Sequence, residues 1–321
     1  MKHLNRSNQG WVAVADLGSN TFQLLIGRVR AGWLETAFRY KTGVQIGKGG
    51  MTLKTILPEA IERAVAVLQH FRSILGEYGL TEKDCIVLGT SAFRNADNQK
   101  EVIDKILNET GFVVQVISGD LEAELIFKGV IASGIIENKE TALIIDIGGG
   151  SVEFILCEGK KQLWRQSFEI GGLRLLEKFH KTDPILSTEI EALFAYLDPK
   201  LAPLKEILKS SKPGILIGCS GTFDTLVEID QKLKNERFEE VGSQPKYHLP
   251  QADFEFLSQK IIAANRAERL AIPGMIELRV DMIVVAVLLT QYVLSLMKNP
   301  EIRVSTFALK EGAFFHDFAE T

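Results

Sequence analysis

Two short glycine-containing segments of this chain each begin with an aspartate and lie between apolar runs. They are Asp16-Leu17-Gly18-Ser19-Asn20-Thr21 and Asp146-Ile147-Gly148-Gly149-Gly150-Ser151. Glycine and small hydroxyl residues let backbone N–H groups converge on an anion without a side chain in the way. The aspartate can hold a hydrated divalent cation beside that anion. Each segment is therefore a candidate for a loop that binds phosphate oxygens, although one such loop alone is more often a hairpin turn.

The occurrence of two such loops favours the phosphate-binding interpretation. Their aspartates are separated by about one domain length, and the same order of features follows each of them. Two similar domains that face one another across a cleft explain this repetition most economically. The sequence then predicts one site in which phosphate oxygens are contacted from two sides.

The periodicity of apolar residues predicts similar elements around each loop. In the first half, the pattern predicts strands within residues 11–40, a helix over 58–78, strands over 85–89 and 112–117, and a helix over 121–132 that is entered through Ser118-Gly119-Asp120. In the second half, it predicts strands over 142–145, 152–156, 164–168 and 215–217, and helices over 174–180, 187–208 and 282–297. A third glycine turn, Gly218-Cys219-Ser220-Gly221-Thr222, follows the strand at 215–217, and the polar residues 235–250 predict a loop.

Composition and charge exclude several classes of protein. Apolar residues make up 46% of the 321 residues, which suffices for substantial cores, and the length suggests two domains. The formal net charge of −4 gives no overall attraction to nucleic acid. The longest apolar stretch, residues 282–297, contains polar residues and is shorter than the roughly 20 residues of a membrane span. The apolar segment at residues 11–15 is too short for a signal peptide, so the cytoplasm is the expected location.

Other familiar sites fail on spacing. Residues 43–49 resemble a P-loop, but three residues separate the glycines where four are required, and a glycine replaces the magnesium-binding Ser or Thr. The five histidines never show the spacing of a helical metal pair. Cys85, Cys157 and Cys219 lie far apart in apolar runs, which predicts buried free thiols.

The chain resembles the exopolyphosphatase and guanosine pentaphosphate phosphatase family, a branch of the superfamily of actin, the Hsp70 ATPase domain and the sugar kinases. The matching motifs span nearly the whole chain and are the two aspartate-glycine loops with Val152-Glu153, the run from Thr90 through Arg94 to Asn98, Ile117 to Ala123, Gly171-Gly172-Leu173-Arg174, Gly218 to Thr222, and Arg279-Val280-Asp281. One departure lies near the C-terminus. Lys310 stands where the family usually has an arginine before Glu-Gly, which removes the fork for a bidentate contact.

The resemblance implies an α/β protein with the two-lobe, ribonuclease-H-like fold of the actin type. Mixed sheets flanked by helices form the lobes, and the active site lies in the cleft between them. We expect the lobes to comprise residues 1–130 and 131–321, with the boundary near 127–138. The terminal helix after Lys310 could pack back on the first lobe.

The resemblance also implies roles for individual residues. Glu122 is the expected general base, because the family pattern Gly-x-x-Glu-Ala falls on it and not on the nearby Glu124. Asp16, Asp146 and Glu153 are expected to hold Mg²⁺, with Mn²⁺ as an alternative and with waters retained in the metal shell. The expected phosphate-binding residues are Gly18, Ser19, Asn20, Thr21, Arg94, Gly148, Gly149, Gly150, Ser151 and Gly221.

Structural interpretations of these residues stay open at this stage. Any acidic residue in a first helical turn stabilises the helix dipole, so Glu122 and Glu124 are equivalent on pattern alone. Glu153 could be a solvent-facing residue of an alternating strand, and Arg94 could cap the end of an element. Arg174 and Arg279 could equally form ion pairs with Glu177 and Asp281.

The expected function is Mg²⁺-dependent hydrolysis of phosphoanhydrides, with release of orthophosphate from polyphosphate ends or from guanosine pentaphosphate. The alternatives are an ATP-dependent small-molecule kinase or ATPase of the same superfamily, and a non-catalytic sensor of polyanions. Family analogy suggests a homodimer, with neither nucleic acid nor membrane as partner. The acidic chain and its end at Thr321 predict a preference for short substrates and distributive hydrolysis.

Overall fold

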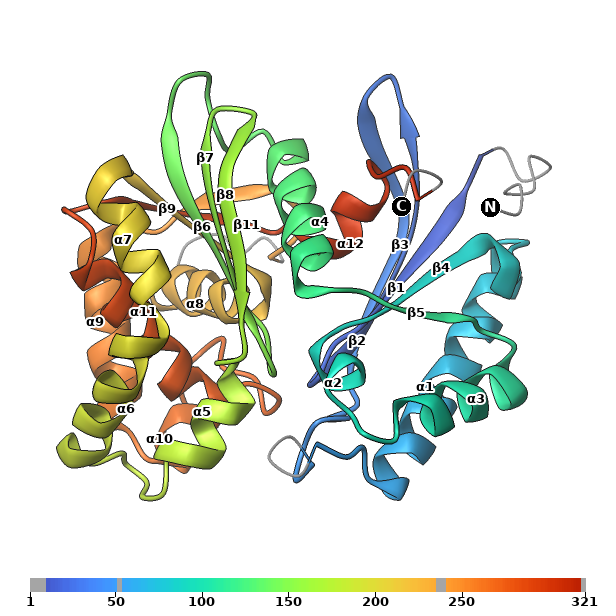
Figure 1. The fold of residues 1–321 in the computed structure, drawn as a ribbon, viewed down its shortest axis with the longest axis horizontal. Helices are drawn as coiled ribbons and strands as arrows, with labels where there is room; N and C mark the ends of the chain where they lie inside the picture. Colours follow the sequence, from blue (N-terminus) through green and yellow to red (C-terminus); the bar gives the residue numbers. More distant parts are fainter. Residues whose placement is uncertain (1–9, 51–53, 235–240, 319–321) are drawn as a thin grey trace.

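Two β-sheets lie side by side, and each is built around one of the aspartate-glycine loops (Figure 1). The computed structural model describes residues 10–50, 54–234 and 241–318. The first sheet has the strand order β3-β2-β1-β4-β5, and the second has the order β10-β11-β9-β6-β7-β8. The predicted two-lobe α/β architecture with mixed sheets flanked by helices is therefore observed.

The first sheet combines an antiparallel meander with parallel strands. Its strands are β1 (Val12–Leu17), β2 (Thr21–Arg30), β3 (Trp33–Gly43), β4 (Cys85–Gly89) and β5 (Val114–Val116). Strand β1 pairs antiparallel with β2 and parallel with β4. The helices of this half are α1 (Pro58–Glu77), the short α2 (Ser91–Arg94) and α3 (Gln99–Thr110), followed by α4 (Gly119–Ala132). A 3₁₀ turn covers Glu82–Asp84.

The second sheet repeats this plan. Its strands are β6 (Thr141–Ile147), β7 (Val152–Glu158), β8 (Lys161–Phe168), β9 (Ile215–Cys219), β10 (Lys246–His248) and β11 (Glu301–Ser305). Strand β6 pairs antiparallel with β7 and parallel with β9, as β1 does with β2 and β4. The helices are α5 (Gly172–Phe179), α6 (Ser187–Lys200), α7 (Ala202–Ser211), α8 (Ser220–Leu233), α9 (Gln251–Ala263), α10 (Arg266–Leu270), α11 (Met282–Ser295) and α12 (Leu309–Ala313). The duplication inferred from the two loops thus extends to the strand pairing.

Local sequence explains the main helices. Buried residues of α1 recur at helical spacing from Ala60 to Leu75, and Pro58 occupies the start of the helix, where its missing N–H costs nothing. Helix α3 ends at Gly111, whose φ of 80° is in the left-handed region that glycine tolerates. Helix α11 is buried on nearly all sides, as its apolar sequence predicts. Among the described residues, no helix has the length and apolar character to cross a membrane.

Alternate residues of the central strands belong to different cores. Ala13, Ala15 and Leu17 of β1 face the core under α1 and α3, whereas Val14 faces a core between the sheets. In β6, Leu143 and Ile145 face the core under the helices of the second half. A core between the sheets, packed around α4 and α12, thus joins the two halves.

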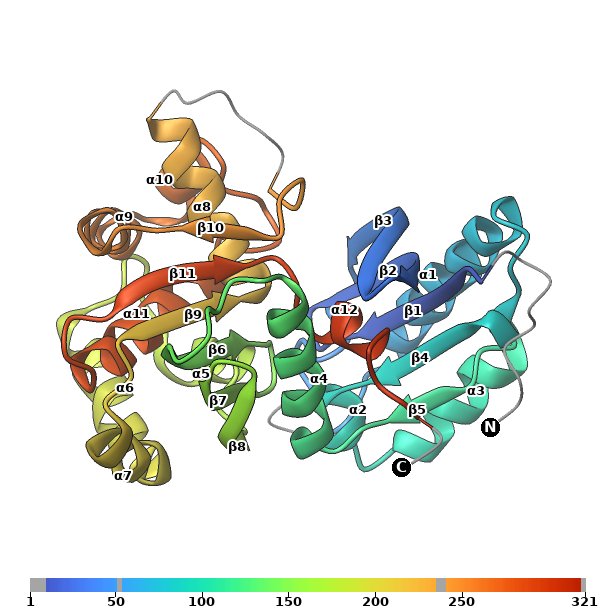
Figure 2. The same ribbon diagram turned by 90° about the horizontal axis from the view of Figure 1, so that it is seen from above.

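Helices α4 and α12 occupy the space between the two sheets (Figure 2). Two glycines let them approach closely. A Cβ atom added to Gly129 of α4 would lie 2.0 Å from the carbonyl oxygen of Ala308, and one added to Gly312 of α12 would lie 1.7 Å from that of Leu125. The C-terminal part of the chain therefore returns to pack against α4.

Three expectations need correction. The helix expected over 187–208 is two helices, α6 and α7, because the ring of Pro203 cannot continue a helix through Leu201. The loop expected over 235–250 contains strand β10, which pairs with β11, while residues 235–240 lie outside the described residues. The three cysteines are free as expected, but Cys85 is half-buried whereas Cys157 and Cys219 are fully buried.

Candidate active site

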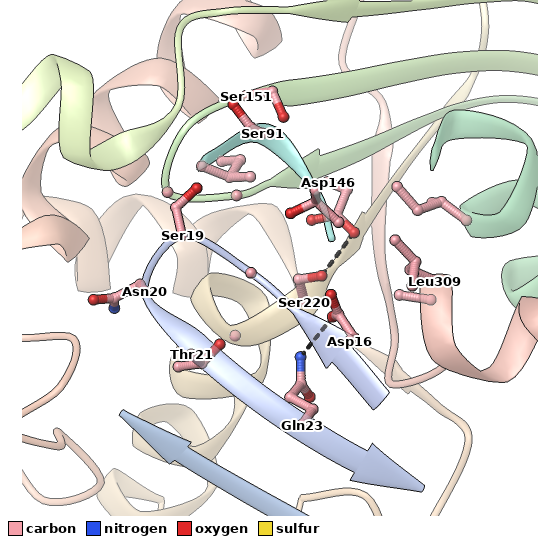
Figure 3. A pocket seen from close by; sticks show the side chains of 18 of the residues that line it. Asp16, Ser19, Asn20, Thr21, Gln23, Ser91, Asp146, Ser151, Ser220 and Leu309 are labelled. Atoms are coloured by element: carbon pink, nitrogen blue, oxygen red, sulfur yellow. Dashed lines mark hydrogen bonds between the residues drawn. The ribbon is translucent and has the colours of Figure 1, made fainter. Parts of the chain in front are cut away.

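The two aspartate-glycine loops have the same internal geometry and face one another (Figure 3). In the first loop the Gly18 N–H donates to the Thr21 carbonyl at 3.0 Å, and in the second the Gly148 N–H donates to the Ser151 carbonyl at 3.0 Å. A Cβ atom added to Gly149 would lie 3.0 Å from the Cβ of Ser19. The loops thus meet in one pocket, and a side chain at position 149 would crowd Ser19.

Neighbouring backbone fixes each loop in place. The carbonyl of Asn20 accepts hydrogen bonds from the N–H groups of Val44 and Gln45, at 3.1 and 2.9 Å. The second loop is held by the start of α5, whose Gly172 N–H donates to the Gly148 carbonyl at 2.8 Å. These bonds attach the carbonyl groups of both loops to the surrounding backbone.

One pocket between the sheets collects nearly all of the residues that the sequence singled out. The predicted site residues that line it are Asp16, Gly18, Ser19, Asn20, Thr21, Glu122, Asp146, Gly148, Gly149, Gly150, Ser151, Glu153 and Gly221. Arg94 is the exception, because it does not line this pocket. The roles of the lining residues in catalysis and binding remain predictions, but the structure places these residues around one pocket.

Buried carboxylates dominate the pocket. Burial raises the pKa of Asp16 to about 7 and that of Glu122 to about 7, the latter in spite of the opposing effect of Arg94. Burial also raises the pKa of Asp146, and burial together with the nearby Glu122 raises that of Glu153 well above its usual range. These four carboxyl groups with raised pKa values lie in one pocket. A cation bound among them would stabilise their ionised form.

The donor set fits a hydrated divalent cation better than a fully protein-bound one. The Oδ1 atom of Asp16 is buried and has no hydrogen-bond partner among the described residues, so it could accept a cation or its water shell. Within residues 10–50, 54–234 and 241–318, however, no three His, Cys, Asp or Glu side chains lie close enough to hold one ion together. Mg²⁺, which usually keeps several waters, is compatible with both observations.

Glu122 lies in the first turn of α4, and the local sequence explains this. The side chain of Ser118 accepts a hydrogen bond from the Leu121 N–H at 3.1 Å, which starts the helix as predicted. Glu122 is 7% exposed and accepts a hydrogen bond from Arg94 Nη1 at 2.9 Å. Glu124 instead accepts a hydrogen bond from Arg165 at 3.1 Å. The structure thus separates the two glutamates, since Glu122 alone of the pair lines the pocket.

Two structural interpretations of site residues are wrong. Glu153 does not face solvent; it is 1% exposed and accepts a 2.6 Å hydrogen bond from Ser167. Arg279 does not pair with Asp281, whose carboxylate accepts from Arg266 at 3.0 Å. Strand alternation failed for Glu153 because both faces of this sheet are covered by helices or by the core between the sheets.

The segment expected to be a third glycine turn, Gly218 to Thr222, instead forms the end of β9 and the start of α8. Ser220 and Arg279 line the pocket at this junction. Ser220, with φ of 67°, donates a hydrogen bond from Oγ to Asp146 Oδ2 at 2.7 Å. A Cβ atom added to Gly221 would lie 1.9 Å from Nη2 of Arg279, so glycine makes room for that guanidinium. The Nε atom of Arg279 is buried and has no hydrogen-bond partner among the described residues. Ser220 and Arg279 therefore line the site, although they were not among the predicted site residues.

Sequence reasoning missed several other pocket residues. Lys41 comes from β3 and lies 3.8 Å from Asp224 of α8, and burial together with Arg279 lowers the pKa of Lys41 to about 8. Lys310 also lines the pocket, 3.1 Å from the fully buried Glu311. No motif or periodicity marks Lys41 or Asp224, and only the family departure drew attention to Lys310.

This arrangement suits chemistry on phosphate groups. Backbone donors from two loops can stabilise phosphoryl oxygens, and the lysine and arginine side chains that line the pocket can neutralise further charge. A carboxylate whose pKa is near 7 can accept a proton from water at neutral pH. The pocket thus combines an anion cradle, candidate metal ligands and a candidate base.

Comparison with known proteins places the chain among phosphatases. The Ppx/GppA phosphatase family matches residues 25–320. The chain is 35% identical over 243 residues to a bifunctional 3-dehydroquinate synthase/phosphatase of Fusobacterium nucleatum. It is 27% identical over 314 residues to a guanosine-5′-triphosphate,3′-diphosphate pyrophosphatase of Vibrio vulnificus. These matches cover 74% and 98% of this chain but only 36% and 60% of the two relatives.

Solved structures agree with this placement. A crystal structure of an exopolyphosphatase from Cytophaga hutchinsonii is 44% identical, with a TM-score of 0.90 and coverage of 95% of this chain and 96% of the other. A Ppx/GppA family member from Aquifex aeolicus shares the fold, with 22% identity, a TM-score of 0.76 and coverage of 94% and 95%. The expected family resemblance and the two-lobe α/β fold with mixed sheets are thus confirmed.

Proposed function

Because the chain belongs to the Ppx/GppA phosphatase family, we propose that it hydrolyses phosphoanhydride bonds and releases the terminal orthophosphate of inorganic polyphosphate, guanosine pentaphosphate or both. One observation carries the proposal. Two glycine loops of identical geometry face one pocket, and the buried Glu122 carboxylate lies in that pocket with a pKa near 7. Water activation and phosphate stabilisation can then occur at the same place.

Different residues of the pocket would serve different steps of an in-line displacement. The N–H groups and hydroxyls of Ser19 to Thr21 and Gly149 to Ser151 would hold the oxygens of the terminal phosphoryl group. Glu122 would accept the proton of the attacking water, and Arg94 orients its carboxylate through the 2.9 Å hydrogen bond. Lys41, Arg279 and Lys310 also line the pocket and would neutralise the phosphates that depart.

Asp16, Asp146 and Glu153 would hold Mg²⁺, or Mn²⁺ in its place, through carboxylate oxygens and bound water. The ion would supply further neutralisation of the phosphoryl oxygens. The unpartnered Oδ1 of Asp16 supports this assignment. The 2.7 Å hydrogen bond from Ser220 keeps the Asp146 carboxylate directed into the pocket.

The direct test is a measurement of phosphate release with Mg²⁺ from polyphosphates of several lengths, guanosine pentaphosphate, ATP and pyrophosphate. We expect release from at least one of the first two substrate types without a nucleotide cosubstrate. Protein with Glu122→Gln, purified in the same way, controls for contaminating phosphatases. Phosphorylation of a small acceptor by ATP would identify a kinase instead, and tight polyphosphate binding without turnover would identify a sensor.

A further inference from the structure

Four side chains from both halves of the molecule converge on the carboxylate of Glu169. Its Oε2 atom accepts hydrogen bonds from Ser91 Oγ at 3.0 Å, Asn95 Nδ2 at 2.9 Å and Arg174 Nη2 at 2.9 Å. Its Oε1 atom lies 3.4 Å from Arg94 Nη2. The motifs of the sequence contain all four donors, but the proposed mechanism gives no task to Ser91, Asn95 or Arg174.

These groups lie where the two halves meet, at the edge of the pocket. Ser91 and Arg94 belong to α2 of the first half, and Asn95 follows it directly. Glu169 lies between β8 and α5 of the second half, and Arg174 belongs to α5. Ser91 lines the pocket, and Arg174 Nε donates to the carbonyl of Gly150 in the second glycine loop at 2.9 Å. Glu169 thus ties the halves together beside the phosphate-binding loops.

The donor set has the chemistry of an oxyanion site. Two guanidinium groups, one hydroxyl and one amide are the donors that bind phosphate oxygens in proteins. The Glu169 side chain is 43% exposed, whereas the side chains of Arg94 and Arg174 are only 18% and 24% exposed. The anion is therefore the most accessible member of the cluster, and the donors form the wall behind it.

Arg94 could release Glu169 and keep its other contacts, because different nitrogen atoms make them. Nη1 of Arg94 is committed to Glu122 at 2.9 Å and to the Ile117 carbonyl at 3.0 Å. The contact with Glu169 uses Nη2 and is the longest of the set. A phosphate oxygen could replace the Glu169 carboxylate there while Arg94 continues to hold Glu122.

We propose that Ser91, Arg94, Asn95 and Arg174 form an anion subsite at the edge of the pocket, and that Glu169 fills it as an intramolecular competitor of phosphate. A phosphate group of substrate or product displaces the Glu169 carboxylate and takes over its donors. The choice of phosphate as the ligand rests on the proposed function. Displacement also breaks the contacts of Glu169 with Ser91 and Arg94 of α2. Binding of phosphate in the subsite would therefore weaken the contact between the two halves.

The test compares Glu169→Gln with the unmodified protein in calorimetric titrations with orthophosphate and in the KM for polyphosphate. The glutamine retains the shape but loses the charge, and its amide group is a poor partner for four donors. Loss of a partly exposed competing charge should tighten orthophosphate binding by about three- to fivefold, and the KM should fall in parallel if substrate phosphates use the subsite. Glu158→Gln, at the far end of β7, changes the net charge equally and should alter neither quantity.

Glu169→Asp provides a second variant that keeps the charge but shortens the reach across the halves, and we expect it too to tighten orthophosphate binding. Unchanged or weaker binding in the folded Gln and Asp variants would overturn the proposal, because Glu169 would then only support its neighbours. The result is separable from the hydrolase proposal. Tighter orthophosphate binding in a protein that hydrolyses no phosphoanhydride would retain the subsite and reject the hydrolase, and unchanged binding in an active hydrolase would do the reverse.

Discussion

At the scale of single residues, the environment of Glu122 distinguishes it from Glu124. Both occupy the start of α4, but Glu122 is buried beside Arg94 and lines the pocket, whereas Glu124 pairs with Arg165 and Lys128 outside it. Burial raises the pKa of Glu122 to about 7, so the carboxylate is a stronger base than an exposed glutamate. The same helix turn therefore carries one candidate base and one structural glutamate.

Substitution Glu122→Gln should lower kcat by about 100-fold or more and leave KM nearly unchanged, because the amide cannot accept the proton of the attacking water. Steady-state phosphate release measures both parameters. Glu124→Gln, two residues away, should retain nearly full kcat. Equal losses of kcat in the two variants would contradict the assignment of Glu122 as the base.

At the scale of elements, the junction between β9 and α8 places a hydroxyl at the cost of backbone strain. Ser220 adopts φ of 67°, a region that non-glycine residues rarely occupy, and it is the first residue of α8. Its Oγ reaches Asp146, which lies at the end of the adjacent strand β6. The strain and the hydrogen bond can be separated by two substitutions at this position.

Ser220→Ala keeps the strain but removes the hydroxyl, and Ser220→Gly removes both. We expect both variants to require more Mg²⁺ for half-maximal activity and for half-maximal thermal stabilisation, because Asp146 loses its hydrogen-bond donor. The glycine variant should be more stable than the alanine variant by about 1 kcal/mol. Asp146→Asn should weaken the Mg²⁺ response further. An unchanged Mg²⁺ titration in both Ser220 variants would show that the hydroxyl does not position Asp146.

The contact between α4 and α12 depends on glycine on both helices. Gly129→Ala or Gly312→Ala would place a methyl group within about 2 Å of a backbone carbonyl oxygen, so the helices must move apart. We expect each variant to lose about 2–3 kcal/mol of unfolding free energy, measured by urea titration. Gly76→Ala in α1 is the matched control, because nothing lies within 4 Å of the added carbon.

That control variant should gain about 0.5–1 kcal/mol, since alanine loses less backbone entropy in a helix than glycine does. Gains of similar size at positions 76, 129 and 312 would mean that helix propensity, and not the close packing of α4 on α12, controls the result.

At the scale of the whole molecule, the pocket between the sheets concentrates carboxylates that resist ionisation. The folded protein holds protons on Asp16 and Glu122 up to about pH 7, whereas the unfolded chain releases them near pH 4. Because the folded state binds more protons in this window, the free energy of unfolding falls as the pH rises from about 4 to 7. Above about pH 7 both states are ionised, and this contribution levels off.

Thermal unfolding without divalent cations should therefore show a lower Tm at pH 8 than at pH 5.5, and Mg²⁺ should raise the Tm more at pH 8, where the carboxylates are charged. Asp16→Asn should flatten both dependences. Asp120→Asn is the control, because a hydrogen bond from Arg165 holds the pKa of Asp120 below its usual range. A pH dependence that is identical in the Asp16 variant and the unmodified protein would show that Asp16 is not a source of the effect.

The features that could be predicted from the sequence are those that depend on local backbone rules. Glycine and small hydroxyl residues after an aspartate, between two apolar runs, sufficed to predict both loops, because few other residues allow such turns. Short continuous apolar runs predicted the central strands, and Ser118 predicted the start of α4. Family motifs located the pocket residues, and the repeated loops indicated two similar halves that meet at one site.

The contacts between side chains that are distant in the sequence could not be predicted, because they depend on how the two halves assemble. Arg94, which is expected to bind phosphate, contacts Glu122 and Glu169, which lie 28 and 75 residues away in the sequence. Lys41 enters the pocket from β3 without any local mark, and the burial of Glu153 depends on the packing of both sheet faces. Local patterns record backbone conformation and average burial. Which charged side chains pair depends on the strand order and on the packing of helices from distant parts of the chain. Such pairs can therefore be identified only in the assembled structure.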